Sequence, residues 1–97
     1  MEFSLDHIIV GDNPKASRYE ATLDGVPMAV ARYERVGGQI VFTHTIVAEA
    51  AEGRGVGAKL VKFALDQARA EGLAVTPLCP FVQSYLRRHP EYQELVG

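Results

Sequence analysis

The chain has 97 residues, of which 47% are hydrophobic and 23% are charged, a composition typical of one folded domain rather than of a disordered segment. Its net charge of −2 and its scattered Lys and Arg residues argue against nucleic acid as a main partner. No apolar run approaches the roughly 18 residues of a membrane span, and the N-terminal sequence MEFSLDHIIV carries acids where a signal peptide needs positive charge.

Cys79 is the single cysteine of the sequence. A single cysteine excludes an internal disulfide and a multi-cysteine zinc site. We expect one domain over residues 1–97, located in the cytoplasm, with no metal site and with neither a membrane nor a nucleic acid as partner.

The first half of the chain predicts an antiparallel meander of strands. Polar and apolar residues alternate over residues 17–23, and Asp24-Gly25 and Gly37-Gly38 are pairs that tight hairpin turns favour. An earlier short apolar run ends in a cluster of turn formers at residues 11–14. The last meander strand is apolar enough to be central in the sheet. The expected strands are residues 7–10, 17–23, 26–36 and 39–47.

From Val56 the apolar spacing changes from two to between three and four, which predicts an amphipathic helix that ends at Gly72. Residues 73–78 follow as a buried strand, which should lie parallel to the last meander strand because a helix crosses over between them. Pro77 indicates that this strand leaves the ladder early. A second helix over residues 80–89, with Pro in its first turn, and a short turn over residues 90–95 follow.

A glycine-rich turn, residues 53–57, joins the meander to the first helix. Its glycines allow a tight bend, and a helix that begins there presents unpaired N–H groups and a positive dipole end, which suit phosphate. The turn is not a P-loop, because Ala58 and Lys59 follow Gly57 where Lys and Ser or Thr are needed. It also lacks the context of a dinucleotide fingerprint, a first βαβ unit with a later acidic residue. The alternative is a tight turn that begins an ordinary helix.

The segment EGRGVGAKL resembles the acyl-CoA pyrophosphate loop of the GNAT superfamily of N-acetyltransferases, written Gln/Arg-x-x-Gly-x-Gly/Ala. Gly55 and Gly57 fall on the two small positions, whereas Glu52 stands where Gln or Arg is usual. The Glu52 carboxylate repels a pyrophosphate, and Arg54 can compensate for it. The order of the elements is also that of the GNAT core. The segments HT, EGRGVG and PLCPFVQSYLRRHPEY together resemble a family of very small GNAT-like proteins.

This resemblance implies an α/β fold of α+β type: a minimal GNAT fold, in which a C-terminal helix follows the meander and a β-α-β crossover. It implies an acetyl-CoA-dependent N-acetyltransferase. Residues 11–17 leave no room for the two helices that follow the first strand in typical GNAT domains, and the sequence ends at Gly97 without their C-terminal hairpin. Because those elements wall the acceptor site, we expect an open acceptor side and an amine that is large, protein-borne or loosely specified.

Three residues are candidates for catalysis, each with a structural alternative. His44 is a candidate base for the amine, although a residue that shares a strand face with Phe42 and Ile46 can equally be a core histidine. Cys79, where a helix dipole favours the thiolate, is a candidate nucleophile that accepts the acetyl group first, or else a small buried side chain. The resemblance places Tyr85 where a tyrosine protonates the departing CoA thiolate, but a tyrosine on an amphipathic helix is more often core packing.

The resemblance also implies where CoA binds. In the fold, the last meander strand and the final strand separate, and the pantetheine arm pairs with backbone groups in the gap. The turn holds the pyrophosphate, and Arg88, beside Arg87 and His89, can reach the 3′-phosphate, unless these side chains are only solvated. The implied contacts are Thr45, Ile46, Val47, Gly53, Arg54, Gly55, Val56, Gly57, Ala58, Lys59 and Arg88.

Three functions are compatible with these features. The first is an acetyl-CoA-dependent N-acetyltransferase that acts on an unidentified amine, either directly or through Cys79. The second is a non-catalytic CoA- or acyl-CoA-binding module, which the missing acceptor walls favour. The third is an interaction domain that binds no CoA, in which case the glycine turn is incidental.

Overall fold

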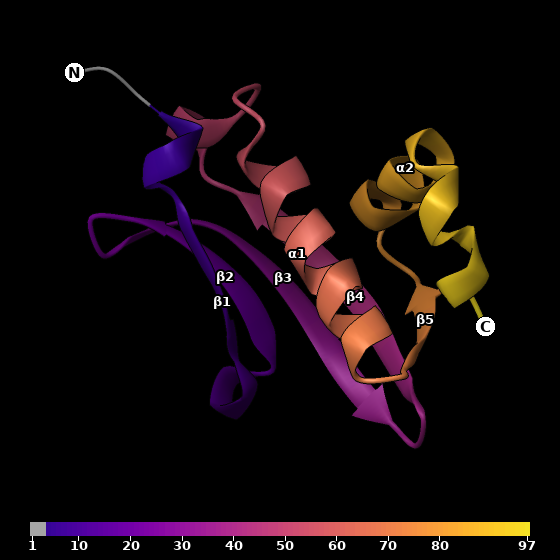
Figure 1. Ribbon diagram of the computed structural model, residues 1–97. Helices are drawn as coiled ribbons and strands as arrows, with labels where there is room; N and C mark the ends of the chain where they lie inside the picture. Colours follow the sequence, from indigo (N-terminus) through magenta and orange to yellow (C-terminus); the bar gives the residue numbers. More distant parts are fainter. Residues whose placement is uncertain (1–3) are drawn as a thin grey trace.

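The computed structural model describes residues 4–97 and contains a five-stranded sheet in the order β1-β2-β3-β4-β5 with two α-helices (Figure 1). The sheet is antiparallel except for the last pair, because β5 lies parallel to β4. The strands are β1 Ile9–Asn13, β2 Arg18–Leu23, β3 Val26–Val36, β4 Gln39–Val47 and β5 Ala74–Pro77. The helices are α1 Val56–Ala70 and α2 Pro80–Arg88, and short 3-10 turns are Leu5–His7, Pro14–Ala16, Glu49–Ala51 and Pro90–Leu95. The predicted α+β architecture is thus confirmed.

The meander forms as predicted, with one change at its first strand. Asp24 and Gly25 have φ angles of 51° and 79°, the positive values that the two-residue hairpin turn between β2 and β3 requires. β1 does not end before residue 11 but continues to Asn13, which lies opposite Arg18. The chain reverses only at Pro14–Ala16, where the Asn13 side chain accepts a hydrogen bond from the Ala16 N–H. These turn-forming residues therefore extend the strand and cap the turn that follows it.

β5 pairs with only the first part of β4, residues Gln39 to Phe42. Two features end this ladder: Pro77 has no N–H to donate, and Thr43 is an extra residue, a bulge, in the pairing of β4 with β3. The N–H groups of Leu78 and Cys79 then both donate to the Phe42 carbonyl oxygen, at 3.0 and 3.1 Å. Beyond this point β4 and the chain that leads into α2 separate, as predicted from Pro77.

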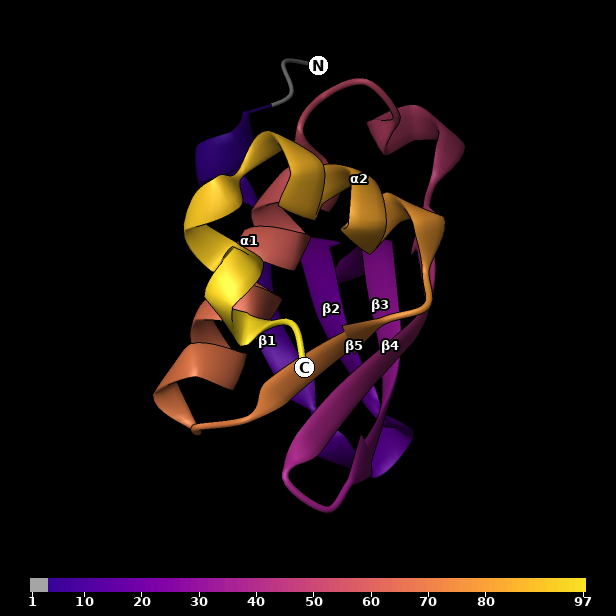
Figure 2. The same cartoon turned by 90° about the vertical axis from the view of Figure 1, so that its right-hand side faces the viewer.

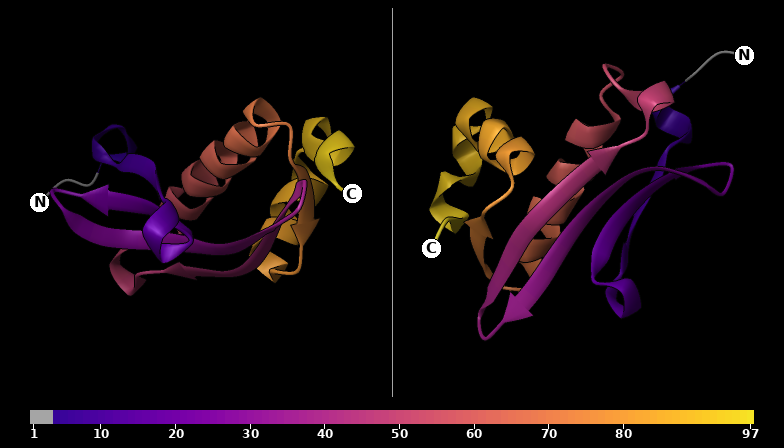
Figure 3. Two further views of the ribbon diagram at one scale, coloured as in Figure 1. Left: turned by 90° about the horizontal axis from the view of Figure 1, so that it is seen from below. Right: turned by 180° about the vertical axis from the view of Figure 1, so that it is seen from behind.

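α1 crosses one face of the sheet, and the hydrophobic core lies between them. The facing residues of β2 and β3 are small at the centre, so the helix packs closely on the sheet, while Tyr19, Tyr33 and Phe42 fill the space around them. No helix within residues 4–97 covers the opposite face, which is called the outer face below (Figure 3, right). The buried stripe of α1 is Val56, Gly57, Leu60, Val61, Ala64, Leu65 and Ala68.

α2 and the last turn lie beside β5 and close the edge of the core (Figure 2). Tyr92 donates a hydrogen bond to Asp66 of α1 at 2.6 Å, and Arg69 of α1 binds both Glu94 and the Glu91 carbonyl. These contacts hold the last turn, Pro90–Leu95, against α1. Across residues 4–97, the helices are all too short or too polar to cross a membrane.

Candidate functional site

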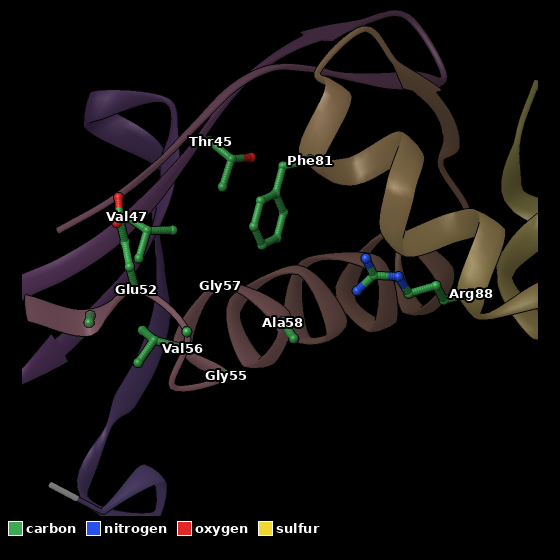
Figure 4. Close-up of a pocket in the computed structure, with 11 residues that line it drawn as sticks. Thr45, Val47, Glu52, Gly55, Val56, Gly57, Ala58, Phe81 and Arg88 are labelled. Atoms are coloured by element: carbon green, nitrogen blue, oxygen red, sulfur yellow. The ribbon is translucent and has the colours of Figure 1, made fainter. Parts of the chain in front are cut away.

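A cleft of about 540 Å³ lies where β4 has separated from β5, between the end of β4, the glycine turn and α2 (Figure 4). One wall is the free edge of β4, the floor is the start of α1, and the other wall is α2. The lining residues are Thr45, Val47, Ala51, Glu52, Gly53, Gly55, Val56, Gly57, Ala58, Phe81 and Arg88. The prediction from sequence named nine of these eleven residues, Glu52 as a departure from the motif and the other eight as cofactor contacts.

The glycine turn exposes backbone donors at the start of α1. Gly53 and Gly55 have φ angles of 72° and 82°, which an L side chain adopts only with strain. Gly55 is the N-cap of α1, and no acceptor within residues 4–97 takes the N–H groups of the first turn, Val56 to Ala58. These donors and the positive end of the helix dipole open onto the cleft, so this part of it suits an anion.

Gly57 has a second role, because it allows α2 to approach α1. A Cβ atom at Gly57 would lie 2.5 Å from Cζ of Phe81, closer than such atoms ever approach. The Phe81 ring, 38% exposed, lies between Thr45 and Gly57 in the cleft (Figure 4). Phe81 was not among the residues predicted from the sequence, because its only local signal is its position beside a proline at a helix start.

The wall formed by β4 is a free strand edge. The Ala48 N–H donates to the Met28 carbonyl of β3, and bonded and non-bonded positions alternate along an antiparallel pair. The register Val47 opposite Ala29 and Thr45 opposite Ala31 therefore turns the N–H and C=O groups of Thr45 and Val47 away from β3, toward the cleft. An extended ligand can pair with this edge as another strand would.

Cys79 lies next to the cleft, where the strands separate, and contacts the lining residue Thr45. Its side chain is 3% exposed, and its thiol donates a hydrogen bond to Oγ1 of Thr45 at 3.2 Å. It is the residue just before α2, so the positive end of that helix faces it. The sequence had indicated only the backbone of Thr45, yet its hydroxyl is the contact that holds the Cys79 sulfur next to the β4 edge.

His44 lies on the outer face of the sheet, opposite Arg32 of β3 and away from Cys79. The expectation that it shares a face with Phe42 is wrong, because the extra residue Thr43 shifts the alternation of β4. Phe42 is buried under α1, whereas His44 and Ile46 are exposed on the other side. His44 is therefore not a core histidine, and its role as a base stays a prediction.

Tyr85 and Arg88 differ in their relation to the cleft. Arg88 lines it from α2, whereas Tyr85 lines a smaller groove between α1 and α2 that Ala58, Phe81 and Arg88 also border. The Tyr85 ring stacks on His89 with centroids 3.9 Å apart. Burial raises the pKa of Tyr85 above its ordinary value, so the phenol stays protonated. Its role as an acid stays a prediction, since the structure gives it packing contacts.

Lys59 and Arg54 point to the N-terminal turn rather than into the cleft. The Lys59 ammonium donates to the carbonyl oxygens of Leu5 and Ile8, at 2.6 and 2.9 Å, and so fastens that turn to α1. Arg54 lies beside the same turn, in a hollow that it shares with Leu5 and Asp6. The charge that faces the cleft comes from Glu52 and Arg88. Within residues 4–97 no cluster of His, Cys, Asp or Glu side chains is arranged to hold a metal ion.

Comparison with known proteins agrees with this geometry. Residues 18–95 match the family model described as GCN5-related N-acetyl-transferase. Protein NATD1 of Gallus gallus is 37% identical over 90 residues, which cover 91% of this chain and 82% of the relative. Protein NATD1 of Homo sapiens is 41% identical over 68 residues, 69% of this chain and 60% of the relative. The solution structure of a GCN5-like protein from Staphylococcus aureus shares the fold, with a TM-score of 0.73, 23% identity, and 96% and 91% of the two chains covered. The chain belongs to the GCN5-related N-acetyl-transferase family.

Proposed function

We propose that this protein is an acetyl-CoA-dependent N-acetyltransferase whose cleft holds CoA along β4. The observation that carries the proposal is that the cleft runs from the free N–H groups of α1 to Thr45, whose hydroxyl contacts the buried Cys79 thiol. The first turn of α1 supplies the N–H groups, the β4 edge follows, and Cys79 lies where the strands separate. CoA has the matching sequence of parts: a diphosphate, an extended arm with two amides, and a thiol.

The fit of the diphosphate rests on backbone groups. The N–H groups of Val56, Gly57 and Ala58 point out of the helix start, and Gly55 keeps their approach free of a side chain. Arg88 adds a positive charge from the opposite wall. Glu52 opposes it, because a carboxylate in the same cleft repels a diphosphate. We therefore expect weaker CoA binding than a Gln or Arg at this position would give.

The fit of the pantetheine arm rests on the free edge of β4. The backbone groups of Thr45 and Val47 can pair with its amides, in the position that another strand would take. Phe81 covers the arm from the side of α2. Along this path the reactive end of the arm arrives beside Thr45 and Cys79, which are in hydrogen-bond contact.

The residues at this end support two routes of transfer. When bound, acetyl-CoA supplies an activated acyl group. In the first route, the Cys79 sulfur attacks the acetyl carbon and the bond to the CoA sulfur breaks, and the thiol proton leaves with CoA. The amine then attacks acetylated Cys79, and its proton returns to the sulfur. In the second route the amine attacks the acetyl carbon directly and the bond to the CoA sulfur breaks. His44 accepts the amine proton from the outer face, and a proton is returned to the departing CoA thiolate. The acceptor is an amine in both routes.

A non-catalytic CoA-binding module is the second candidate function. The observation that favours it is that none of the three candidate catalytic side chains lines the cleft: His44 and Tyr85 line other pockets, and Cys79 only contacts the lining residue Thr45. Such a module would bind CoA on the same surface but transfer no acetyl group. The two candidates therefore share the first experiment and differ in the second.

The first experiment is thermal unfolding with and without CoA and acetyl-CoA. A ligand at about 100 times its dissociation constant adds roughly 2.7 kcal/mol, which raises the midpoint of a domain of this size by about 10 °C or more. Arg88→Gln should weaken CoA binding about tenfold, as expected for a lost charged contact to a phosphate. Arg87→Gln is the matched control, because Arg87 is exposed on the same helix and does not line the cleft. Unchanged midpoints at millimolar ligand would remove both candidate functions.

A further inference from the structure

The outer face of the sheet carries a polar pocket of about 370 Å³ that is separate from the cleft. Two backbone irregularities form it: the bulge at Thr43 and the left-handed conformation of Ser17, which has a φ angle of 53°. Its polar side chains are those of Ser17, Arg32, Glu34, Thr43 and His44. The pocket therefore collects one cation, one carboxylate, two hydroxyls and an imidazole.

Arg32 is the charged group in this pocket that is available to a ligand anion. Three other arginines of the chain are engaged: Arg18 binds Glu20, Arg35 binds Glu71 and Asp12, and Arg69 binds Glu94. Arg32 has no hydrogen-bond or ion-pair partner for its side chain within residues 4–97, although Glu34 lies only two residues away on the same face. Its guanidinium can therefore form a two-pronged contact with an incoming carboxylate.

His44 is the direct cross-strand neighbour of Arg32. The Cβ atoms of such a pair lie about 5 Å apart, so both side chains can touch one small molecule. His44 also precedes Thr45, whose side chain lines the cleft from the other face of the same strand. Because β5 pairs with β4 only as far as Phe42, the two faces of the sheet meet along this edge of β4. An amine held at His44 therefore lies on the outer side of the same β4 edge that lines the cleft at Thr45.

We propose that this pocket selects the acceptor, and that it takes an amine that carries a carboxylate, of the α-amino acid type. The carboxylate binds Arg32, and the amine lies toward His44 and the β4 edge. The inference rests on the proposed function, because it names the acceptor of the same transfer. Glu34 narrows the class of acceptor. Its carboxylate repels a doubly charged phosphate more strongly than a singly charged carboxylate, so amino acids are favoured over phosphorylated amines.

The binding test uses a panel of α-amino acids, each paired with its own α-amide, so that the members of a pair differ in the carboxylate. The 15N NMR spectrum of the protein reports the backbone N–H groups of residues 32, 43 and 44 and the side-chain N–H of Arg32. We expect saturable shifts there with at least one free acid and none with its amide. Equal shifts with acid and amide, shifts spread over exposed arginines such as Arg87, or no shift with any acid would overturn the proposal.

Two matched variants test the role of the charge. Arg32→Gln should weaken binding of the acid about tenfold or more, the effect of losing a charged hydrogen-bond partner. Glu34→Gln, two residues away on the same face, should keep or strengthen it. Both side chains are exposed, so both variants should unfold at the wild-type midpoint. If Arg32→Gln binds the acid as well as the wild type does, the assignment is wrong.

A transfer assay separates this inference from the proposed function. With acetyl-CoA as donor, we expect kcat/KM to be about tenfold or more higher for the free acid than for its amide, and Arg32→Gln to remove that preference through KM. Transfer to acids and amides at equal rates would overturn the acceptor inference and leave the acetyltransferase function intact. Binding of acids without any CoA binding would remove the function and leave the pocket.

Discussion

The two ends of the sheet differ in whether their polar groups are paired. At the end where α1 finishes, Tyr33 donates to Asp12 at 2.6 Å, and Arg35 binds Asp12 and Glu71 at 3.3 and 2.7 Å (Figure 1). At the end where α1 begins, the N–H groups of its first turn and the edge of β4 have no partner within residues 4–97. Backbone groups are left unpaired only where water or a ligand reaches them. The first end therefore stabilises the fold, and the second leaves backbone groups open to water or a ligand.

The largest expected effect concerns Cys79, at the end where backbone groups are left open. If transfer proceeds through Cys79, wild-type protein should acquire a covalent acetyl group from acetyl-CoA, and Cys79→Ala should abolish it, because it removes the chain's only thiol. Intact-mass spectrometry after incubation, with peptide mapping to the residue, measures the added acetyl mass. The variant should keep the full rise in unfolding midpoint with CoA, since the diphosphate contacts are unchanged.

The direct route and the binding module predict different results for the same samples. A wild-type protein that gains no acetyl mass but acetylates an amine would use the direct route. A wild-type protein that gains no mass and acetylates no amine would be the CoA-binding module. An acetyl group that persists in Cys79→Ala would show that the acetylated site lies elsewhere.

The next effect concerns the polar network at the opposite end. Tyr33→Phe removes the hydrogen bond to Asp12 and should lower the free energy of unfolding by about 1.5 kcal/mol, the value for a bond to a charged group. Urea-induced unfolding measures this change. The rise in midpoint that CoA causes should stay at its wild-type size, because the network lies at the far end of the sheet. A change in CoA affinity would mean that the two ends are coupled.

A smaller effect should appear where α1 and α2 meet in the cleft. Gly57→Ala should destabilise the wild type, because its new Cβ displaces the Phe81 ring. In a Phe81→Ala background the same change should be neutral or stabilising, since Ala favours a helix over Gly by up to about 1 kcal/mol. The four proteins of this cycle should give a coupling energy of about 1–2 kcal/mol. Additive effects on the free energy of unfolding would show that positions 57 and 81 are not energetically coupled.

The sequence predicted the parts of the fold that depend on local pattern. Asp24-Gly25 identified a hairpin because its backbone angles need those residues, and Pro77 identified the end of the β5 ladder because proline lacks an N–H. The glycine turn, most of the cleft floor and Arg88 followed from a motif whose spacing is set by the start of one helix. In each case a few neighbouring residues determine the outcome.

The features that the sequence did not predict depend on contacts between segments that are distant in the sequence. The face of His44 could not be predicted, since the bulge at Thr43 arises from pairing with β3 rather than from the residues of β4. Lys59 has the spacing of an exposed helix residue, but carbonyl groups from the N-terminal turn take its ammonium. The roles of Phe81 and of the Thr45 hydroxyl depend on how α2 packs against β4 and α1, which local sequence does not determine.

The smallest expected effect concerns a buried polar group without a partner, at the end of the sheet where α1 finishes. Tyr19 is completely buried there, and its hydroxyl is the one buried side-chain polar atom within residues 4–97 without a partner. Tyr19→Phe keeps the ring contacts with Tyr33 and Phe42 and removes this group, so it should raise the free energy of unfolding by about 1 kcal/mol. Urea-induced unfolding at pH 7 measures the change, and a loss of stability would imply an ordered water on the hydroxyl.

The same variant should change the response to alkaline pH. Burial, followed by the charge of Asp12, raises the pKa of Tyr19 from 10.0 to about 12. Since the folded state holds the proton more tightly, this group contributes stability that is complete below pH 10 and is lost as pH rises toward about 12. Tyr19→Phe should remove that part of the loss, so its unfolding free energy should fall less steeply between these values than that of the wild type. Parallel curves would mean that the Tyr19 proton is held no more tightly in the folded chain than in the unfolded one.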